Sequence, residues 1–284
     1  MARNLLFQAA RFFSATTLES SMNKKTITLL ISALSVSLSA LADEAPASPH
    51  TFTGNVGLVS DFVYRGISQT HTQPAVQGGF DYAHASGLYA GIWGSSISWV
   101  SDGLGGSYPL ELDIYGGYKG SFGGDFGYDV GVLSYNYPGH GRVSGSVRAD
   151  TVEAYGAVSW KWLTLKYSHT VSSHFVGWTT DNGGKTRGSG YLELNATYNL
   201  GDGWGLTGHV GHQKVKGNRD ASYSDWRLGV TKDLGFGVIG LAYSDTNAEG
   251  SCSAGEAYCW GTSEGTRNFK DVGRGTAILS FSKS

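Results

Sequence analysis

The feature that most constrains this chain is a repeated unit of about ten residues in which small or apolar residues alternate with polar ones. Long loops and tight turns alternate as the connections between these units. The first three units lie between Phe52 and Ser98, separated by a polar loop at Ile67–Pro74 and a tight turn around Ser86–Gly87. A long loop followed by a tight turn is typical of an up-and-down antiparallel sheet. Strands of about ten residues are also long enough to cross a bilayer when tilted.

The clearest alternation runs from Leu110 to Lys119. Leu110 and Ile114 lie on one face of this segment, and Glu111 and Asp113 lie on the other. A soluble sandwich would bury the apolar row, whereas a membrane barrel would turn it toward lipid and the charged row toward the lumen. The period is the same in both cases, so alternation alone leaves both open.

The lengths of the connections favour the barrel. Reading the alternation to the C-terminus gives twelve strands, with five short turns separated by six long loops. A sandwich mixes loop lengths and uses Greek-key crossings, whereas membrane barrels place short turns at one end and long loops at the other. We therefore predict an all-β fold, a transmembrane up-and-down antiparallel β-barrel of about 12 strands. The short turns are expected near Ser86, Gly123, Lys161, Asp202 and Phe236.

Aromatic residues lie near both ends of the expected strands, and we expect them to form two girdles at the membrane interfaces. The residues near short turns are Phe52, Tyr82, Tyr118, Phe126, Trp160, Tyr198, Trp204, Phe236 and Phe281. The residues near long loops are Phe62, Tyr64, Trp99, Tyr135, Tyr137, Tyr191, Trp226 and Tyr243.

The N-terminal part of the chain has the features of an export signal. Asn23-Lys24-Lys25 is a short cationic region, residues 27–41 are largely apolar, and Ala40-Leu41-Ala42 is a small-x-small cleavage site. We expect residues 1–42 to comprise a start extension and a secretory signal peptide that is removed. Residues 43–284 then form a single barrel domain. A membrane anchor helix is the weaker interpretation, because about 20 residues are needed to cross.

The stretch that opens the first three units resembles a known family. The segments SDFVYRGISQT (residues 60–70) and PAVQGGFDY (residues 74–82), continued by residues 86–93, are similar to the opening signature of the TorF-type porins, the Gcw_chp proteobacterial family. The resemblance implies a barrel in the outer membrane of a Gram-negative bacterium, with no catalytic residues to carry over. Such a barrel would contact outer-membrane lipid, and periplasmic chaperones and the barrel-assembly machinery would serve its biogenesis.

The residues themselves indicate little chemistry. The one His-x-Ser motif, His84-Ala85-Ser86, falls at a tight turn, and Ser168-His169 and Ser173-His174 are pairs that a Ser-rich chain with eight histidines readily supplies. We predict no catalytic, cofactor-binding or metal site. Nucleic acid is not an expected partner, because the formal net charge is −2 and removing residues 1–42 takes away more bases than acids.

The two cysteines, Cys252 and Cys259, lie in the longest expected loop. An exported protein meets an oxidising compartment, so we predict a disulfide between them. A metal site is the alternative, but two thiolates without a nearby histidine pair do not make a zinc site.

These observations predict a porin-like channel that passes small hydrophilic solutes. The alternatives are an outer-membrane enzyme that acts on lipid, a non-conducting structural barrel, or a soluble periplasmic barrel with the charged row outside. A small excess of acids in the lumen predicts a weak cation preference. The predicted pore-lining residues are Asp61, Arg65, Asp81, Glu111, Asp113, Lys119, Asp129, Glu153, Lys166, Glu193, Asp225, Arg227 and Arg274.

Overall fold

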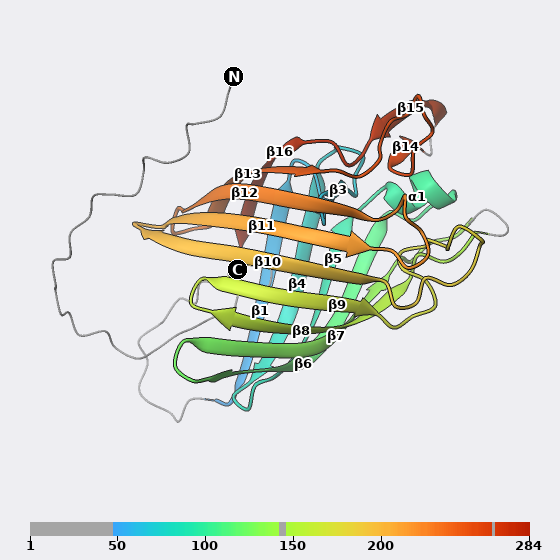
Figure 1. The fold of residues 1–284 in the computed structure, drawn as a ribbon. Helices are drawn as coiled ribbons and strands as arrows, with labels where there is room; N and C mark the ends of the chain where they lie inside the picture. The colour runs from blue at the N-terminus through green and yellow to red at the C-terminus, as the bar shows by residue number, and fades with distance from the viewer. Residues whose placement is uncertain (1–47, 142–145, 263–264) are drawn as a thin grey trace, which may run out of the picture. The chain divides into compact units, whose positions relative to one another are not determined.

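A computed structural model describes residues 48–141, 146–262 and 265–284, so the expected signal segment at residues 1–42 lies outside the described residues. Twelve strands pair antiparallel in a ring that closes between β1 and β16 (Figure 1). The predicted closed up-and-down barrel is confirmed. The barrel strands are β1 (His50–Val59), β4 (Ala75–His84), β5 (Leu88–Ser96), β6 (Leu110–Phe122), β7 (Phe126–Asn136), β8 (Thr151–Trp160), β9 (Leu163–Thr170), β10 (Gly190–Gly201), β11 (Trp204–Lys214), β12 (Tyr223–Asp233), β13 (Val238–Thr246) and β16 (Thr276–Lys283).

The connections alternate in length as predicted. Short turns join β4 to β5, β6 to β7, β8 to β9, β10 to β11 and β12 to β13. Two of these turns place a residue other than glycine at positive φ, Lys161 at 53° and Asp202 at 51°. The long connections contain the small elements β2 (Val63–Tyr64), β3 (Ile67–Ser68), α1 (Trp99–Leu104), β14 (Cys259–Thr262) and β15 (Gly265–Asp271). None of the helical segments among the described residues has the length and hydrophobicity needed to span a bilayer.

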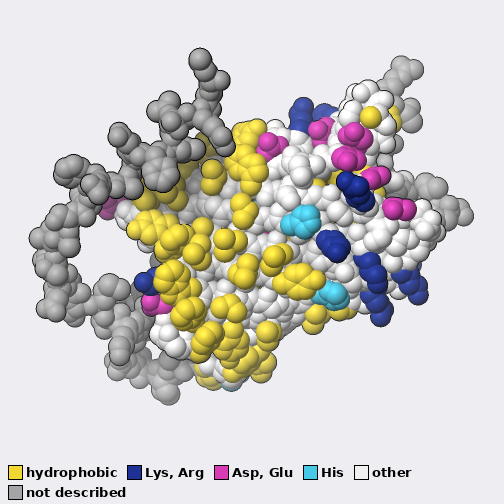
Figure 2. All heavy atoms as spheres, viewed as in Figure 1, with side chains coloured by type: hydrophobic (Ala, Val, Ile, Leu, Met, Phe, Trp, Pro, Cys, Tyr) yellow, Lys and Arg dark blue, Asp and Glu magenta, His cyan; other side chains and the backbone are white. Residues whose placement is uncertain are grey.

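The outer wall of the barrel is apolar and the inner wall is polar. Leu228, Val56 and Ile114 keep 62%, 54% and 52% of their side chains exposed, and the hydrophobic side chains gather in a broad field over the strands (Figure 2). Glu153, on the opposite face of its strand from such residues, is only 1% exposed. Water-soluble domains rarely expose apolar surface on this scale. The alternation is therefore that of a membrane barrel, and it excludes the soluble arrangement with the charged row outside.

The aromatic girdle at the short-turn end is present. The ring centroids of Phe122 and Phe126 lie 5.6 Å apart, and those of Phe126 and Trp160 lie 6.4 Å apart. At the long-loop end, Trp226 and Tyr243 face outward and pack at 5.7 Å.

Apart from Trp226 and Tyr243, the prediction of an aromatic girdle at the long-loop end is wrong. Four of its residues are buried inside the molecule, because they occupy inward-facing strand positions or long loops that fold inward. They are Trp99, Tyr135, Tyr137 and Tyr191, all at most 7% exposed.

Candidate functional site

A two-stranded hairpin from the first long loop enters the lumen. Its strands β2 and β3 pair Tyr64 with Ile67, which leaves Arg65 and Gly66 as a two-residue turn. Both turn residues have positive φ, 47° at Arg65 and 80° at Gly66, as a type I′ turn requires. Arginine rarely adopts this conformation, so the surroundings must hold it there. We call residues Val63–Ser68 the crossing hairpin.

Arg65 joins the tip of the crossing hairpin to the opposite wall. Its guanidinium donates to Glu153 on β8 at 2.7 and 3.2 Å and to Gln213 on β11 at 2.7 Å. Its Cζ lies 4.2 Å from the ring centroid of Tyr191 on β10. Strands β8 to β11 lie on the far side of the ring from β1 and β4, from which the hairpin originates. The hairpin therefore spans the lumen.

The Arg65–Glu153 pair is buried, with side-chain exposures of 7% and 1%. Burial is the largest single effect and lowers the pKa of Arg65. Glu153, Tyr64 and Tyr135 together outweigh it, so the pKa of Arg65 lies above its ordinary value. A bidentate pair of this kind constrains orientation as well as distance. Removing one partner would leave a buried charge uncompensated.

Further contacts hold the rest of the crossing hairpin. The Tyr64 hydroxyl donates to the Tyr135 hydroxyl at 2.9 Å, which in turn donates to Glu153 at 3.2 Å. A Cβ added at Gly66 would overlap Thr246 and Asp225, so the tip fits only without a side chain there. The turn therefore needs glycine both for its backbone conformation and for its close approach to the wall.

The base of the hairpin is stabilised by Asp61. Its Oδ1 accepts hydrogen bonds from the Ser68 hydroxyl at 2.6 Å and the Thr70 hydroxyl at 3.0 Å. Burial raises the pKa of the Asp61 carboxyl, and the two hydroxyls partly oppose the shift.

The other long loops pack around the hairpin with an apolar core of their own. Trp99 of α1 packs edge-on against Tyr137 at 5.1 Å and stacks on Trp260 of β14 at 6.0 Å. Tyr258 packs against Tyr223 of β12 at 5.1 Å. The long-loop end of the barrel is therefore filled by three buried clusters rather than by separate solvated loops. Their buried residues are Ile97, Trp99, Val100, Tyr135, Tyr137 and Ala149; Ile67, Tyr223, Tyr258 and Val272; and Phe175, Val215 and Ala221.

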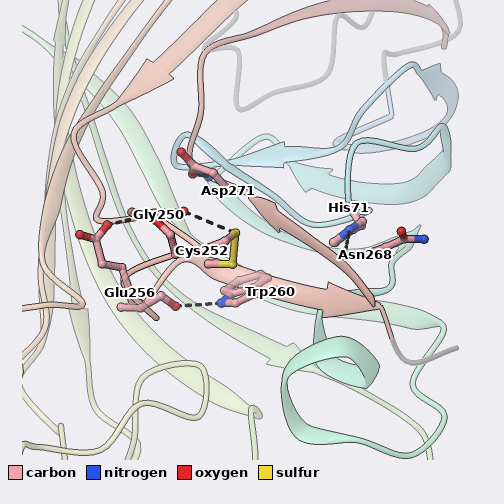
Figure 3. Close-up of a disulfide and its surroundings, with 12 residues drawn as sticks. His71, Gly250, Cys252, Glu256, Trp260, Asn268 and Asp271 are labelled. Carbon is pink, nitrogen blue, oxygen red and sulfur yellow. Dashed lines mark hydrogen bonds between the residues drawn. A yellow bond between two sulfur atoms is a disulfide. The ribbon is translucent and has the colours of Figure 1, made fainter. Parts of the chain in front are cut away.

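The predicted disulfide lies within this loop assembly. Cys252 is bonded to Cys259, the first residue of β14, next to Trp260, whose indole N–H donates to the Ala257 carbonyl at 2.9 Å (Figure 3). The Glu256 carboxylate accepts a hydrogen bond from the Ser251 backbone N–H at 2.6 Å. The disulfide thus closes a small loop beside the aromatic cluster.

Toward the short-turn end, the lumen wall consists of tyrosines lying on glycines. A Cβ added at Gly91 would overlap the Tyr115 ring, and one added at Gly117 would overlap the Tyr89 ring. The Tyr115 hydroxyl donates to Asp81. The missing side chains let the tyrosine rings lie along the wall instead of projecting into the lumen.

A polar network links the tyrosine wall to the hairpin region. His209 Nε2 lies 2.9 Å from Asp225 Oδ2, and His209 Nδ1 lies 2.7 Å from Asn195 Oδ1. The Tyr191 hydroxyl donates to Asp225 at 2.8 Å, and Asn195 donates to Glu193 at 2.8 Å. His209 and Tyr191 were not among the predicted pore-lining residues, although their alternation with outward-facing leucines and valines marks them as inward.

Most of the predicted pore-lining residues lie on barrel strands at inward-facing positions. Asp61 and Arg65 differ, because β1 ends at Val59 and both residues belong to the loop that carries the crossing hairpin. Arg274 lies in the segment before β16, and its side chain is exposed. The inward-facing strand residues are Asp81, Glu111, Asp113, Lys119, Asp129, Glu153, Lys166, Glu193, Asp225 and Arg227.

Two of the serine–histidine pairs have structural explanations. His84 Nδ1 lies 2.8 Å from the Ser86 hydroxyl and accepts from the Ser86 backbone N–H at 3.1 Å, which stabilises the β4–β5 turn. Ser168 is 2% exposed on the inner wall, whereas the adjacent His169 is exposed and contacts Tyr167. Ser168 and His169 therefore point to opposite faces of β9.

The structure is an integral membrane β-barrel with an internal hairpin, because its ring of strands is closed, its outer wall is apolar and its lumen is polar. The chain belongs to the Gcw_chp family: the family model described as "Bacterial protein of unknown function (Gcw_chp)" matches residues 43–284. No curated protein matches the chain.

Several solved barrel structures are similar to the chain at low identity. The KdgM porin is 8% identical with a TM-score of 0.47, over 82% of this chain and 99% of that chain. The NanC porin is 10% identical with a TM-score of 0.48, over 81% and 98%. The toluene transporter TodX of P. putida is 12% identical with a TM-score of 0.42, over 84% and 91%. At these values the similarity carries no information about function.

Proposed function

We propose that this protein is an outer-membrane channel of a Gram-negative bacterium that passes small hydrophilic solutes. The observation that carries the proposal is the closed twelve-stranded ring whose apolar residues face outward while its polar residues line the lumen. Twelve strands lie between the eight that side chains can fill and the sixteen to eighteen that leave an open channel. The lumen is therefore narrow, and the crossing hairpin narrows it further.

In this proposal the short turns face the periplasm and the long loops face outside, as in bacterial outer-membrane barrels. The protein is surrounded by outer-membrane lipid, and chaperones and the barrel-assembly machinery insert it. The last strand presents an outward apolar row, which includes Leu279 and Phe281, to the assembly machinery.

Reconstitution of the mature chain in planar bilayers tests the channel. We expect discrete single-channel steps that the same protein unfolded before addition does not produce. Absence of conductance from barrels that are folded by circular dichroism would contradict the proposal.

A second candidate, a non-conducting structural barrel, is favoured by one observation. The long loops pack through buried aromatic clusters and the hairpin across one end of the lumen. Replacing Val63–Ser68 with a Gly/Ser linker separates the candidates. A channel conducts before and after the change, whereas a plugged structural barrel conducts only afterwards. An enzyme acting on lipid would instead release fatty acid from labelled phospholipid.

We further propose a weak cation preference that originates at the long-loop end. Five of the predicted lumen acids lie near the crossing hairpin or at strand ends beside it, against two predicted bases, Arg65 and Arg274. These acids are Asp61, Glu111, Asp113, Glu153 and Asp225. Further along the strands, Asp81, Asp129 and Glu193 are matched in number by Lys119, Lys166 and Arg227. Fixed charges between low-dielectric walls act strongly on passing ions.

Neutralising Glu111 and Asp113 together tests this origin. We expect the reversal potential in a salt gradient to move toward anion permeability in E111Q/D113N. The matched control D81N/D129N removes two acids from the tyrosine wall and should move it less. An unchanged reversal potential in E111Q/D113N would mean that these side chains do not influence the conducting path.

A further inference from the structure

Basic and aromatic side chains meet on the outer wall where β9, β10 and β11 approach the long loops. Gly190 pairs in register with His169 on one side and with Lys214 on the other. All three positions face outward, because they alternate with inward-facing Tyr191 and Gln213. His169 and Lys214 therefore flank a buried glycine that the Tyr167 ring covers.

Lys216 and Tyr167 complete the group. A Cβ placed on Gly188 would lie 3.9 Å from Lys216 Nζ and 3.8 Å from His169 Cε1, so these two side chains converge over Gly188. The Tyr167 hydroxyl lies 3.3 Å from His169 Nδ1, and its ring covers Gly190. We call Tyr167, His169, Lys214 and Lys216 the outer-wall site.

The charge of the outer-wall site is not neutralised within the described residues. Lys214 and Lys216 are exposed, and neither forms an ion pair there. The acids of the adjacent loops, Asp181 and Asp220, instead line a separate cavity of about 360 Å³. On the face in Figure 2, His and several Lys/Arg side chains border the hydrophobic field.

An apolar surface continues directly from the outer-wall site toward the middle of the barrel. Leu165, Leu192 and Val210 on the same three strands expose 51%, 50% and 53% of their side chains. A ligand held here would place anionic groups against the lysines and acyl chains against the leucines. Lysine side chains at a bilayer boundary attract anionic headgroups.

We propose that the outer-wall site binds a phosphorylated, multiply acylated glycolipid of the lipid A type from the outer leaflet. The Tyr167 ring over Gly190 faces the sugar headgroup, Lys214 and Lys216 pair with its phosphate, and Tyr167 and His169 hydrogen-bond to it. The inference rests on the outer-membrane location and on the orientation proposed above, with the long loops outside.

Native mass spectrometry of the purified barrel with bisphosphorylated lipid A tests the site. We expect K214Q/K216Q to lose roughly tenfold in affinity, given the attraction of two surface lysines to anionic lipid. The matched control K161Q/K232Q removes two lysines from the short-turn end and should bind like the parent. Equal binding by K214Q/K216Q and the parent would overturn the proposal.

Two further lipids identify the ligand chemistry. Dephosphorylated lipid A should bind the parent as weakly as bisphosphorylated lipid A binds K214Q/K216Q. If phosphatidylglycerol binds as tightly as lipid A and loses as much in K214Q/K216Q, the site is one for anionic lipid in general, and the assignment to a glycolipid is wrong.

Failure of this inference is distinguishable from failure of the proposed function. The outer-wall lysines face away from the lumen, so K214Q/K216Q should conduct like the parent whatever it binds. A tag inserted near Asn182 should be reachable on intact cells and one at Asp202 should not. The reverse labelling would overturn the orientation, and this inference with it, without bearing on conductance.

Discussion

The two ends of the barrel interior are built differently. At the long-loop end, the crossing hairpin and three apolar clusters fill the space, and Arg65 joins opposite walls. At the short-turn end, tyrosines such as Tyr115 lie along glycines of the neighbouring strand, and no loop enters among the described residues. The same strands therefore surround a packed core at one end and a wall of tyrosines at the other.

The difference teaches where control of a channel would lie. Strand alternation produces a polar inner wall along the whole barrel, but only the inserted hairpin makes contacts across it. Changes to the hairpin should alter passage most, changes to its anchoring should alter stability, and changes to the tyrosine wall or the outer loops should have smaller effects.

Replacing Val63–Ser68 with a Gly/Ser linker of equal length should cause the largest change. It removes the turn at Arg65–Gly66 and its contacts with β8 and β11, so single-channel conductance should rise severalfold. The matched control replaces the exposed residues 181–185 in the same way and should conduct like the parent. An equal conductance in both variants would show that the hairpin does not limit passage.

Glu153→Gln should destabilise the fold most strongly among single substitutions. It leaves the buried Arg65 guanidinium without its carboxylate, at a cost of about 3–5 kcal/mol. Urea titration in lipid vesicles measures the effect. The control Arg148→Gln breaks an exposed pair with Asp150 and should leave the midpoint almost unchanged. If the variants unfold alike, the Arg65–Glu153 pair does not stabilise the barrel.

Gly91→Val should have an intermediate effect at the tyrosine wall. The new side chain must displace the Tyr115 ring toward the lumen, which should lower conductance and cost about 1–3 kcal/mol. The control Gly156→Val faces outward, where a Cβ meets nothing within 4 Å, and should change neither quantity. Parent-like conductance in Gly91→Val would mean that the tyrosine wall does not border the passage.

Reducing Cys252–Cys259 should have the smallest effect. The bond closes a short loop, with a sequence separation of 7, outside the barrel wall. Proteolysis should become faster within residues 249–262 after reduction, while conductance and the urea midpoint stay the same. Two free thiols in mass spectrometry of the unreduced mature protein would contradict the pairing.

The strand pattern was largely predictable because it is local. Glu111 and Asp113 alternate with Leu110 and Ile114, and two-residue periodicity assigns them to opposite faces before any pairing is known. The alternation of short and long connections then predicted the topology. The assignment of lumen-facing strand positions followed from the same two-residue periodicity, since each strand has only two faces.

The positions and contacts of the long-loop residues are determined by the tertiary structure alone. The segment around Arg65 reads as the end of a strand, yet β1 stops at Val59 and the following residues turn inward. Tyr135 and Tyr191 look like interface aromatics in sequence, but they contact Glu153 and Arg65 inside the lumen. Sequence periodicity determined which residues face lipid and which face inward. Which inward side chains meet across the lumen depends on closure of the ring, because it brings residues 88 and 148 positions apart within hydrogen-bond distance.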